Sequence, residues 1–166
     1  MVLFLIGFMG AGKTPLGHQL AKELGYTFID TDQVFELRFK QTIAEYFAEH
    51  RESSFRREER NILESVATVD NVVIATGGGL PCYKDTMEWM NQHGTTIYLK
   101  QDIEELYERL SPQTQHRPIL KQKKGKALEK HISNLLNERK VYYEQAKFVF
   151  QGPVISPKTV INTIIF

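Results

Sequence analysis

Short apolar runs alternate along the chain with longer segments in which apolar residues recur every three or four positions. Five buried strands are predicted at the apolar runs 2–6, 26–29, 72–75, 95–99 and 148–150. Helical periodicity covers 15–24, 34–39, 42–47, 55–69, 103–110 and 128–146, and a short last helix follows Ser156 and Pro157. Such an alternation predicts an α/β fold with a parallel sheet covered by helices on both faces.

Local end signals refine two of these helices. Pro15 fits the first turn of its helix, where the missing N–H has no intrahelical partner, and Gly25 closes that helix. Asp102 and Glu105 have the spacing of a capping box at the start of the helix 103–110. We therefore expect both helices to begin near these residues.

Composition limits the classes of protein that this chain fits. Its 166 residues suit one domain, and 42% hydrophobic with 25% charged residues is typical of a globular protein. A net charge of +1, from 21 basic and 20 acidic residues, gives no support for nucleic-acid binding. For the lysine-rich run 121–126, a solvated, mobile loop is favoured over the alternative of a basic patch.

Several absences in the sequence favour a cytoplasmic protein. Cys82 is the single cysteine, which rules out a disulfide within the chain and a cysteine metal cluster. The sequence has no apolar window of transmembrane length, and its apolar start has no basic segment before it, so we expect neither a membrane span nor a signal peptide. A monomer is the simplest expectation.

The strongest chemical signal is the segment Gly7-Phe8-Met9-Gly10-Ala11-Gly12-Lys13-Thr14, which matches G-x-x-x-x-G-K-[ST]. It lies between a predicted strand and a predicted helix, as a phosphate-binding loop requires. Its glycines let backbone N–H groups surround phosphate oxygens, and the helix N-terminus adds favourable partial charge. Lys13 is placed to neutralise nucleotide phosphates and Thr14 to ligate Mg²⁺.

Three strands end in residues that suit one binding crevice. The first ends in the phosphate loop, the second in Asp30-Thr31-Asp32 and the third in Gly77-Gly78-Gly79. In an open parallel sheet, ligands bind beyond the carboxyl ends of the strands. Of the two carboxylates, one can hold Mg²⁺ through water and the other can accept a proton from a hydroxyl. The alternatives are that Asp32 caps a helix and that the glycines form a flexible turn.

Three arginines stand where a helix without function would not need them. Arg56 and Glu59 are three residues apart and face the same way, so they can also be a surface ion pair. Arg139 lies on the apolar stripe of its helix, where a charge must be paired or must face a ligand. Arg117 follows the polar segment 111–116, which suits a mobile lid over a transferring phosphate.

The motifs GFMGAGKT, FIDTD, SFRREE, TGGG, HRPIL and NERKVYYEQA, in this order, resemble the shikimate kinase family over nearly the whole chain. The resemblance implies a three-layer P-loop fold of the nucleoside-monophosphate-kinase-like kind, with a five-stranded parallel sheet. It also implies a single kinase domain over 1–166, with a lid at about 111–125 and a substrate-binding helical region at about 33–61. The implied activity is transfer of the γ-phosphate of ATP to the 3-hydroxyl of shikimate, with Mg²⁺, in aromatic amino-acid biosynthesis.

The resemblance also assigns roles to residues. Catalysis falls to Lys13, Asp32 and Arg117. ATP binding falls to Gly10, Ala11, Gly12, Lys13, Thr14, Pro15, Arg109 and Arg117. Shikimate binding falls to Asp32, Arg56, Gly78, Gly79 and Arg139, with Glu59 orienting Arg56, and the metal side falls to Thr14 and, through water, Asp30.

Three positions depart from the family pattern. Pro15 stands where a small or hydroxyl residue is usual, and Arg51 replaces a common glycine before Glu52. The tail 151–154 lacks the basic residue that many members use near adenine, which leaves the adenine pocket unassigned.

Other functions remain in competition. Another small-metabolite kinase of this fold, such as gluconate kinase, is the nearest alternative, and a nucleoside monophosphate kinase would have no evident use for DTD and GGG. A nucleotide-binding regulatory module without phosphotransfer is a different class, although the N-K-x-D motif of GTPases is absent. Packing roles are expected for Cys82, Met87, Trp89 and Met90.

Overall fold

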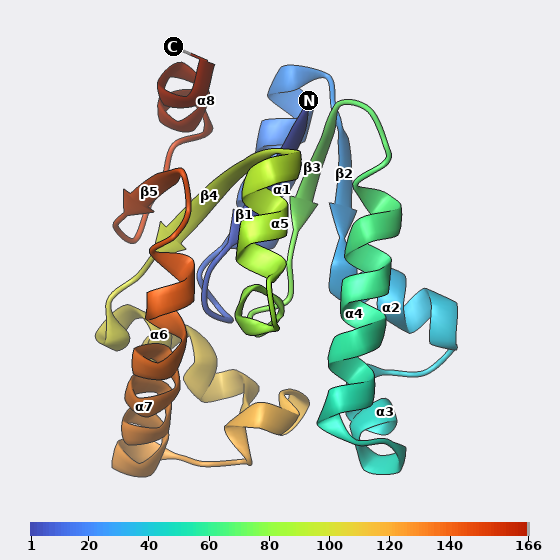
Figure 1. Cartoon of the computed structure of the whole chain (residues 1–166). Coiled ribbons are helices and arrows are strands. Elements are labelled where there is room, and N and C mark those ends of the chain that lie inside the picture. Colours follow the sequence, from blue (N-terminus) through green and yellow to red (C-terminus); the bar gives the residue numbers. More distant parts are fainter. Residues whose placement is uncertain (166) are drawn as a thin grey trace.

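Five parallel strands form the centre of the protein, in the order β2-β3-β1-β4-β5 (Figure 1). The computed structural model describes residues 1–165. The strands are β1 (Val2–Ile6), β2 (Thr27–Asp30), β3 (Val72–Ala75), β4 (Thr95–Lys100) and β5 (Phe148–Gln151). The parallel sheet predicted from the apolar runs is confirmed, with strand bounds shifted by one residue at most.

Helices cover both faces of this sheet, which confirms the three-layer prediction. Alternate residues of β1 face opposite sides: Phe4 and Ile6 pack with α4 (Glu52–Val66), α5 (Thr86–His93) and α7 (Gly125–Tyr143). Leu3 and Leu5 pack with α1 (Lys13–Leu24) and α8 (Pro157–Ile165). The remaining helices are α2 (Thr31–Phe39), α3 (Ile43–Glu49) and α6 (Ile103–Leu110).

Helix ends differ from the predictions where a cap decides them. α1 begins two residues before Pro15, because Gly12 adopts a left-handed conformation (φ 95°) and starts the helix there. The predicted capping box of α6 is wrong: Asp102 makes no side-chain capping bond, and Glu105 pairs with Arg109 instead (2.7 Å). A capping box does form at α3, between Thr42 and Glu45.

The sequence patterns missed α5, although they placed its residues in the core. Met87 and Met90 are buried and Trp89 is partly buried, as expected for packing residues. A helix of eight residues with two buried methionines gives too short a periodic pattern to stand out.

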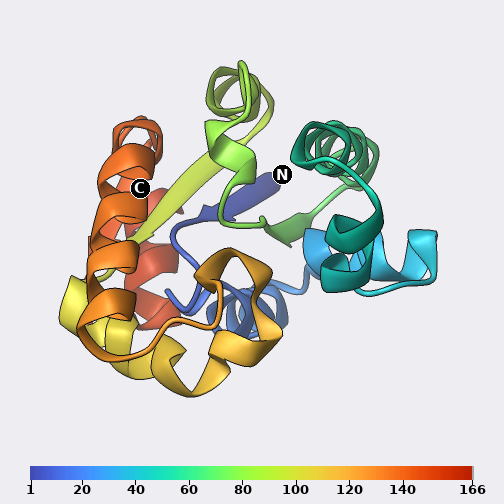
Figure 2. The ribbon, with the colours of Figure 1, turned by 90° about the horizontal axis from the view of Figure 1, so that it is seen from below.

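All five strands point their carboxyl ends toward one edge, and Figure 2 looks onto that edge. There, the segment 111–125 lies between α7 and the α2–α3 region. It contains two short 3-10 helices, Ser111–His116 and Pro118–Leu120. Among the described residues, no helix is long and apolar enough to span a membrane.

Candidate active site

The phosphate-binding loop joins β1 to α1 at the carboxyl edge of the sheet. Gly10 and Gly12 have positive φ angles (78° and 95°), a conformation that other residues adopt only with strain. The ammonium of Lys13 donates hydrogen bonds to the loop carbonyls of Gly7 (2.7 Å) and Phe8 (2.9 Å). Burial lowers the pKa of Lys13 to about 8, so a phosphate that reaches it meets a poorly hydrated cation.

Asp30 and Asp32 have separate tasks. Asp30 Oδ1 accepts the backbone N–H groups of Asp32 (2.9 Å) and Gln33 (3.4 Å), so Asp30, and not Asp32, caps α2. Its other oxygen accepts the hydroxyl of Thr14 (2.8 Å). Asp32 is thus left free, and burial together with the negative charge of Asp30 raises its pKa to about 6.

The oxygen atoms of Thr14 and Asp30 fit a Mg²⁺ site that a nucleotide completes. Hydroxyl and carboxylate oxygens are hard ligands, and Mg²⁺ commonly takes one or two protein groups together with phosphate oxygens and water. Within residues 1–165, no cluster of three or more His, Cys, Asp or Glu could hold a metal alone. The donor set therefore suits an ion that arrives with the nucleotide.

The three glycines after β3 make room for charged side chains. A Cβ on Gly79 would collide with the guanidinium of Arg56, and one on Gly77 would collide with the carboxylate of Glu59. A Cβ on Gly78 would lie 3.2 Å from Nη1 of Arg139. The glycines therefore allow the site's own charged groups to lie against the backbone.

Two buried charged groups beside these glycines each have one polar atom without a protein partner in the part of the chain that the structure describes. Glu59 Oε2 accepts Arg56 Nη1 (2.7 Å), while Glu59 Oε1 and Arg139 Nη1 are buried with no partner among the described residues. Glu59 is 1% and Arg139 7% exposed. Burial raises the pKa of Glu59 to about 7. Because a buried guanidinium nitrogen without an acceptor is unfavourable, Arg139 fits a site that binds an anion.

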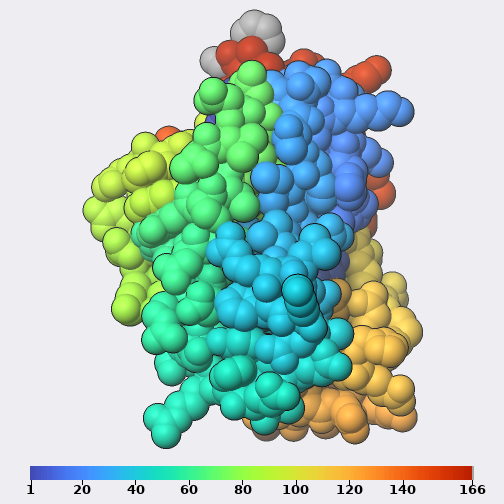
Figure 3. Space-filling view, turned by 90° about the vertical axis from the view of Figure 1, so that its right-hand side faces the viewer, coloured from blue at the N-terminus to red at the C-terminus, as the bar shows by residue number. Residues whose placement is uncertain are grey.

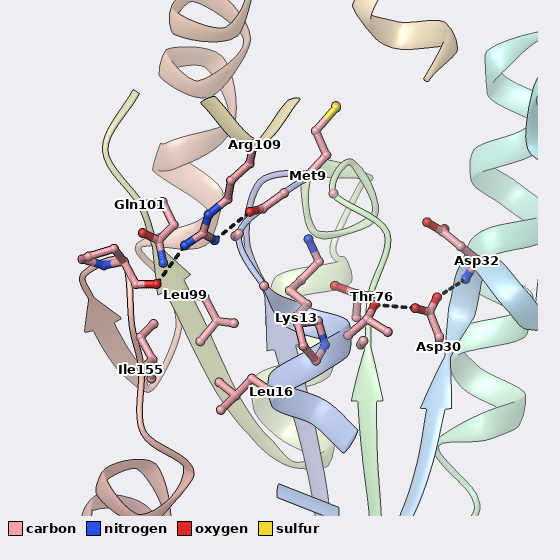
Figure 4. Close-up of a pocket in the computed structure, with 18 of the residues that line it drawn as sticks. Met9, Lys13, Leu16, Asp30, Asp32, Thr76, Leu99, Gln101, Arg109 and Ile155 are labelled. Carbon is pink, nitrogen blue, oxygen red and sulfur yellow. Dashed lines mark hydrogen bonds between the residues drawn. The ribbon is translucent and has the colours of Figure 1, made fainter. Parts of the chain in front are cut away.

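Two further arginines approach the site, Arg109 from α6 and Arg117 from the segment 111–125. Arg117 Nε donates to Gln113 (3.0 Å), and burial lowers its pKa while nearby Asp32 opposes the shift. Arg109 donates to the carbonyls of Gly10 (2.9 Å) and Pro153 (2.8 Å) (Figure 4). It therefore links the phosphate loop to the segment between β5 and α8.

Two cavities meet at this edge and share part of their walls. The larger, about 750 Å³, runs along the phosphate loop to Leu99, Gln101 and Ile155 (Figure 4). The smaller, about 340 Å³, lies among α2, α3, α4 and the segment 111–125, whose gold atoms lie beside the cyan of α2 and α3 in Figure 3. The residues that line both are Met9, Asp30, Asp32, Gly78, Gln113 and Arg117.

Comparisons with known proteins agree with this arrangement. The family model described as shikimate kinase matches residues 9–165. The chain belongs to the shikimate kinase family. Shikimate kinase from Bacteroides fragilis is 45% identical over 161 residues, which cover 97% of this chain and 90% of the relative. That from Parabacteroides distasonis is 45% identical over 150 residues, covering 90% and 87%.

Solved shikimate kinases share the whole fold. The crystal structure of the enzyme from Bacteroides thetaiotaomicron has a TM-score of 0.93 at 39% identity and covers 100% of this chain and 99% of its own. The enzyme from Acinetobacter baumannii, solved in complex with shikimate, has a TM-score of 0.88 at 30% identity, covering 99% and 90%.

In this shikimate kinase family member, every residue to which the sequence assigns a catalytic or binding role lines one or both cavities. The larger cavity is lined by Gly10, Ala11, Gly12, Lys13, Thr14, Pro15, Asp30, Asp32, Gly78, Arg109 and Arg117. The smaller is lined by Asp30, Asp32, Arg56, Glu59, Gly78, Gly79, Arg117 and Arg139.

Sequence reasoning missed other lining residues. Gln113 lies in both cavities and bonds Arg117, and the apolar Ile43, Phe47 and Phe55 line the smaller one. Pro153, Val154 and Ile155 line the larger, in the tail where no basic residue stands. The helical stripe was the signal for Phe55, whereas nothing in the tail's sequence points to a ligand.

Proposed function

We propose that this protein transfers the γ-phosphate of ATP to the 3-hydroxyl of shikimate, giving shikimate 3-phosphate and ADP. The observation that carries the proposal is Arg139: a buried guanidinium with a partnerless Nη1 lines a cavity that meets the phosphate-loop cavity at Asp32. A small acceptor with a carboxylate and a hydroxyl satisfies both ends of this cavity. The kinship with an enzyme solved in complex with shikimate supports the same acceptor here.

ATP would occupy the larger cavity. Its phosphates would lie on the N–H groups of Gly10, Ala11 and Gly12, with Thr14 and Pro15 at the start of α1. The adenine would lie against Arg109 and the segment 153–155, where Val154 is 87% exposed and gains cover from a planar ring. This apolar segment can replace the basic residue that the tail lacks.

Shikimate would occupy the smaller cavity. Its carboxylate would accept forked hydrogen bonds from Arg56 and Arg139, which converge beside Gly78 and Gly79. Glu59 holds Arg56 in place by the 2.7 Å contact. The reacting hydroxyl would then lie at Asp32, on the wall shared with the nucleotide cavity.

The chemistry is in-line transfer across that shared wall. Asp32, whose pKa is about 6, is largely ionised at neutral pH and can orient the hydroxyl and take its proton. Lys13 would leave the Gly7 and Phe8 carbonyls and stabilise charge on the γ-phosphate. Mg²⁺, when bound by Thr14 and through water by Asp30, supplies further charge neutralisation. Arg117 would approach from the lid.

We also propose that the segment 111–125 closes over both ligands, in a single kinase domain that acts as a cytoplasmic monomer in aromatic amino-acid biosynthesis. The lid residues Gln113 and Arg117 already line both cavities, which supports this closing role. Closure would exclude water and bring Arg117 onto the transferring phosphate.

The deciding experiment measures ADP release with shikimate, with gluconate, with a nucleoside monophosphate and with no acceptor. We expect release to depend on shikimate and on Mg²⁺. A shikimate analogue with a neutral amide in place of the carboxylate should lose roughly 2–5 kcal/mol in kcat/KM, because the arginines lose their partner. Equal use of acid and amide, or preference for another acceptor, would refute the proposed acceptor.

A further inference from the structure

The glycine segment after β3 depends on distant groups for its conformation. Thr31 Oγ1 accepts the N–H of Gly77 (3.1 Å), and the turn that follows uses the carbonyls of Gly77 (3.2 Å to Leu80 N) and Gly79 (3.1 Å to Cys82 N). The carbonyl of Gly78 is held differently: it accepts the hydroxyl of Tyr143. This hydroxyl comes from α7, 65 residues further along the chain.

Tyr143 is built into the core and lines neither cavity. Its side chain is fully buried, and its ring lies 5.1 Å from that of Tyr98. Burial raises the pKa of the phenol, although Arg139 acts in the opposite direction, so the hydroxyl stays protonated and donates. Arg139 precedes it by one turn of α7, so both side chains leave the same face of one helix.

The bond to Gly78 O also determines where the next N–H points. In a trans peptide the C=O of one residue and the N–H of the next lie in one plane and point in opposite directions. Tyr143 holds the Gly78 carbonyl, so the N–H of Gly79 points away from α7. Among the described residues, no protein acceptor meets this N–H, and Gly79 lines the smaller cavity beside Arg56.

A peptide between two glycines needs such a restraint. Without Cβ atoms, Gly78 and Gly79 can rotate this peptide at little cost, and a rotated peptide turns the N–H away from the cavity. A stiffer residue at either position would displace the guanidinium of Arg139 or Arg56, which lie against these glycines. The hydrogen bond from the buried Tyr143 side chain holds the carbonyl of this peptide directly and so selects one of its orientations.

We propose that Tyr143 is a positioning residue for the acceptor: its hydroxyl orients the Gly78–Gly79 peptide so that the Gly79 N–H donates to the acceptor beside Arg56. This inference rests on the proposed function for the identity of the acceptor. Because Arg139 and Tyr143 belong to one helix, the guanidinium and the N–H donor are placed relative to each other by α7.

The test replaces Tyr143 by phenylalanine, which removes the hydroxyl and keeps the ring against Tyr98. We expect the KM for shikimate to rise about tenfold, the loss of one oriented hydrogen bond, with the KM for ATP unchanged within twofold. The matched control is Tyr142→Phe, which removes a hydroxyl from the neighbouring position of α7 and should leave both constants unchanged. A Tyr143→Phe variant with the wild-type KM for shikimate overturns the proposal.

A second measurement needs no substrate and separates this inference from the proposed function. In ¹⁵N-labelled protein, the Gly79 amide should exchange freely without ligand and should change its shift in Tyr143→Phe but not in Tyr142→Phe. An unchanged Gly79 signal overturns the positioning role even if the enzyme phosphorylates shikimate. A changed signal in a protein that ignores shikimate upholds the peptide restraint and refutes the acceptor.

If Tyr143→Phe does not fold, the wild-type protein still decides. The Gly79 amide should be unprotected from exchange in the free protein and protected once shikimate is bound. Protection that is already present in the free protein means that the N–H has an internal partner, and it overturns the proposal.

Discussion

Replacing Arg139 by methionine should make the free protein more stable and nearly inactive. In the free protein the Arg139 guanidinium is 7% exposed, and its Nη1 has no partner in residues 1–165. A buried donor left unpaired destabilises by about 1–3 kcal/mol. Methionine has similar length, no donor and an adaptable apolar chain that can pack on Phe8, over which the guanidinium now lies at 5.7 Å.

The magnitude for Arg139→Met follows from these contacts. The free energy of unfolding should rise by about 1–3 kcal/mol, and Tm should rise by about 2–4 °C for each kcal/mol in a chain of this size. In contrast, kcat/KM for shikimate should fall by about 30- to 1000-fold, since a charge-assisted fork to the carboxylate is lost. The same property that makes Arg139 unfavourable in the empty site makes it effective toward an anion.

Thermal unfolding with and without shikimate measures both effects. For the wild type, shikimate at 100 times its Kd should add about 2.7 kcal/mol of stability, and for Arg139→Met this shift should nearly vanish. Lys140→Met is the matched control. Lys140 is the exposed neighbour of Arg139 on α7, so this substitution should change the free energy of unfolding by less than about 0.5 kcal/mol. A lower Tm for Arg139→Met would show that the guanidinium is satisfied in the free protein and would refute the reasoning.

Four further outcomes are expected. Lys13→Ala should lower kcat/KM by about two decades with Tm little changed, and near-normal turnover would remove Lys13 from the mechanism. Since the pKa of Asp32 is raised to about 6, the folded protein binds its proton more tightly than the unfolded chain. Asp32→Asn should therefore stabilise by about 2–3 kcal/mol at pH 7.5, with the gain lost below about pH 4; pH-independent stabilisation would contradict this sign. Gly79→Ala should displace Arg56 and weaken shikimate binding while ATP binding persists, and loss of both would indicate misfolding. Arg117→Ala should lower kcat more than it raises the KM for shikimate, and hydrogen exchange of 111–125 should slow when both ligands bind; equal exchange in both states would exclude a closing lid.

The strands and most helices were predictable because buried positions carry apolar residues, and the spacing of these residues differs between strands and helices. β1 and β3 are buried on both faces, so each reads as an unbroken apolar run. The first residue of each helix was harder to predict, because it depends on which side-chain oxygen accepts the free backbone N–H groups at the helix start. Asp30 caps α2 while its second oxygen holds Thr14, and no local pattern distinguishes this from a cap by Asp32.

The phosphate loop and the charged groups of the site were also predictable from the sequence, but the residues that contact and position them were not. Arg139 stood out because it interrupts an apolar stripe. The sequence did not show why glycines are present at 77–79, since Arg56 and Glu59 approach this backbone only in the folded protein. The bond from Tyr143 to Gly78 joins residues 65 positions apart, and a buried tyrosine on the same stripe looks like any packing residue.

The glycines at 77–79, which line the smaller cavity, also affect how easily a mutation could cause resistance to an inhibitor bound there. Gly77, Gly78 and Gly79 form part of the cavity wall, and their hydrogen-bonding groups belong to the peptide backbone, which most substitutions leave in place. The side chains that could change, such as Ile43, Phe47 and Ile119, lie on the α3 and lid side. Consider an inhibitor that accepts hydrogen bonds from the Gly79 N–H and Arg139 and makes little contact with those apolar residues. Few substitutions would weaken its binding without also weakening the binding of the enzyme's own acceptor.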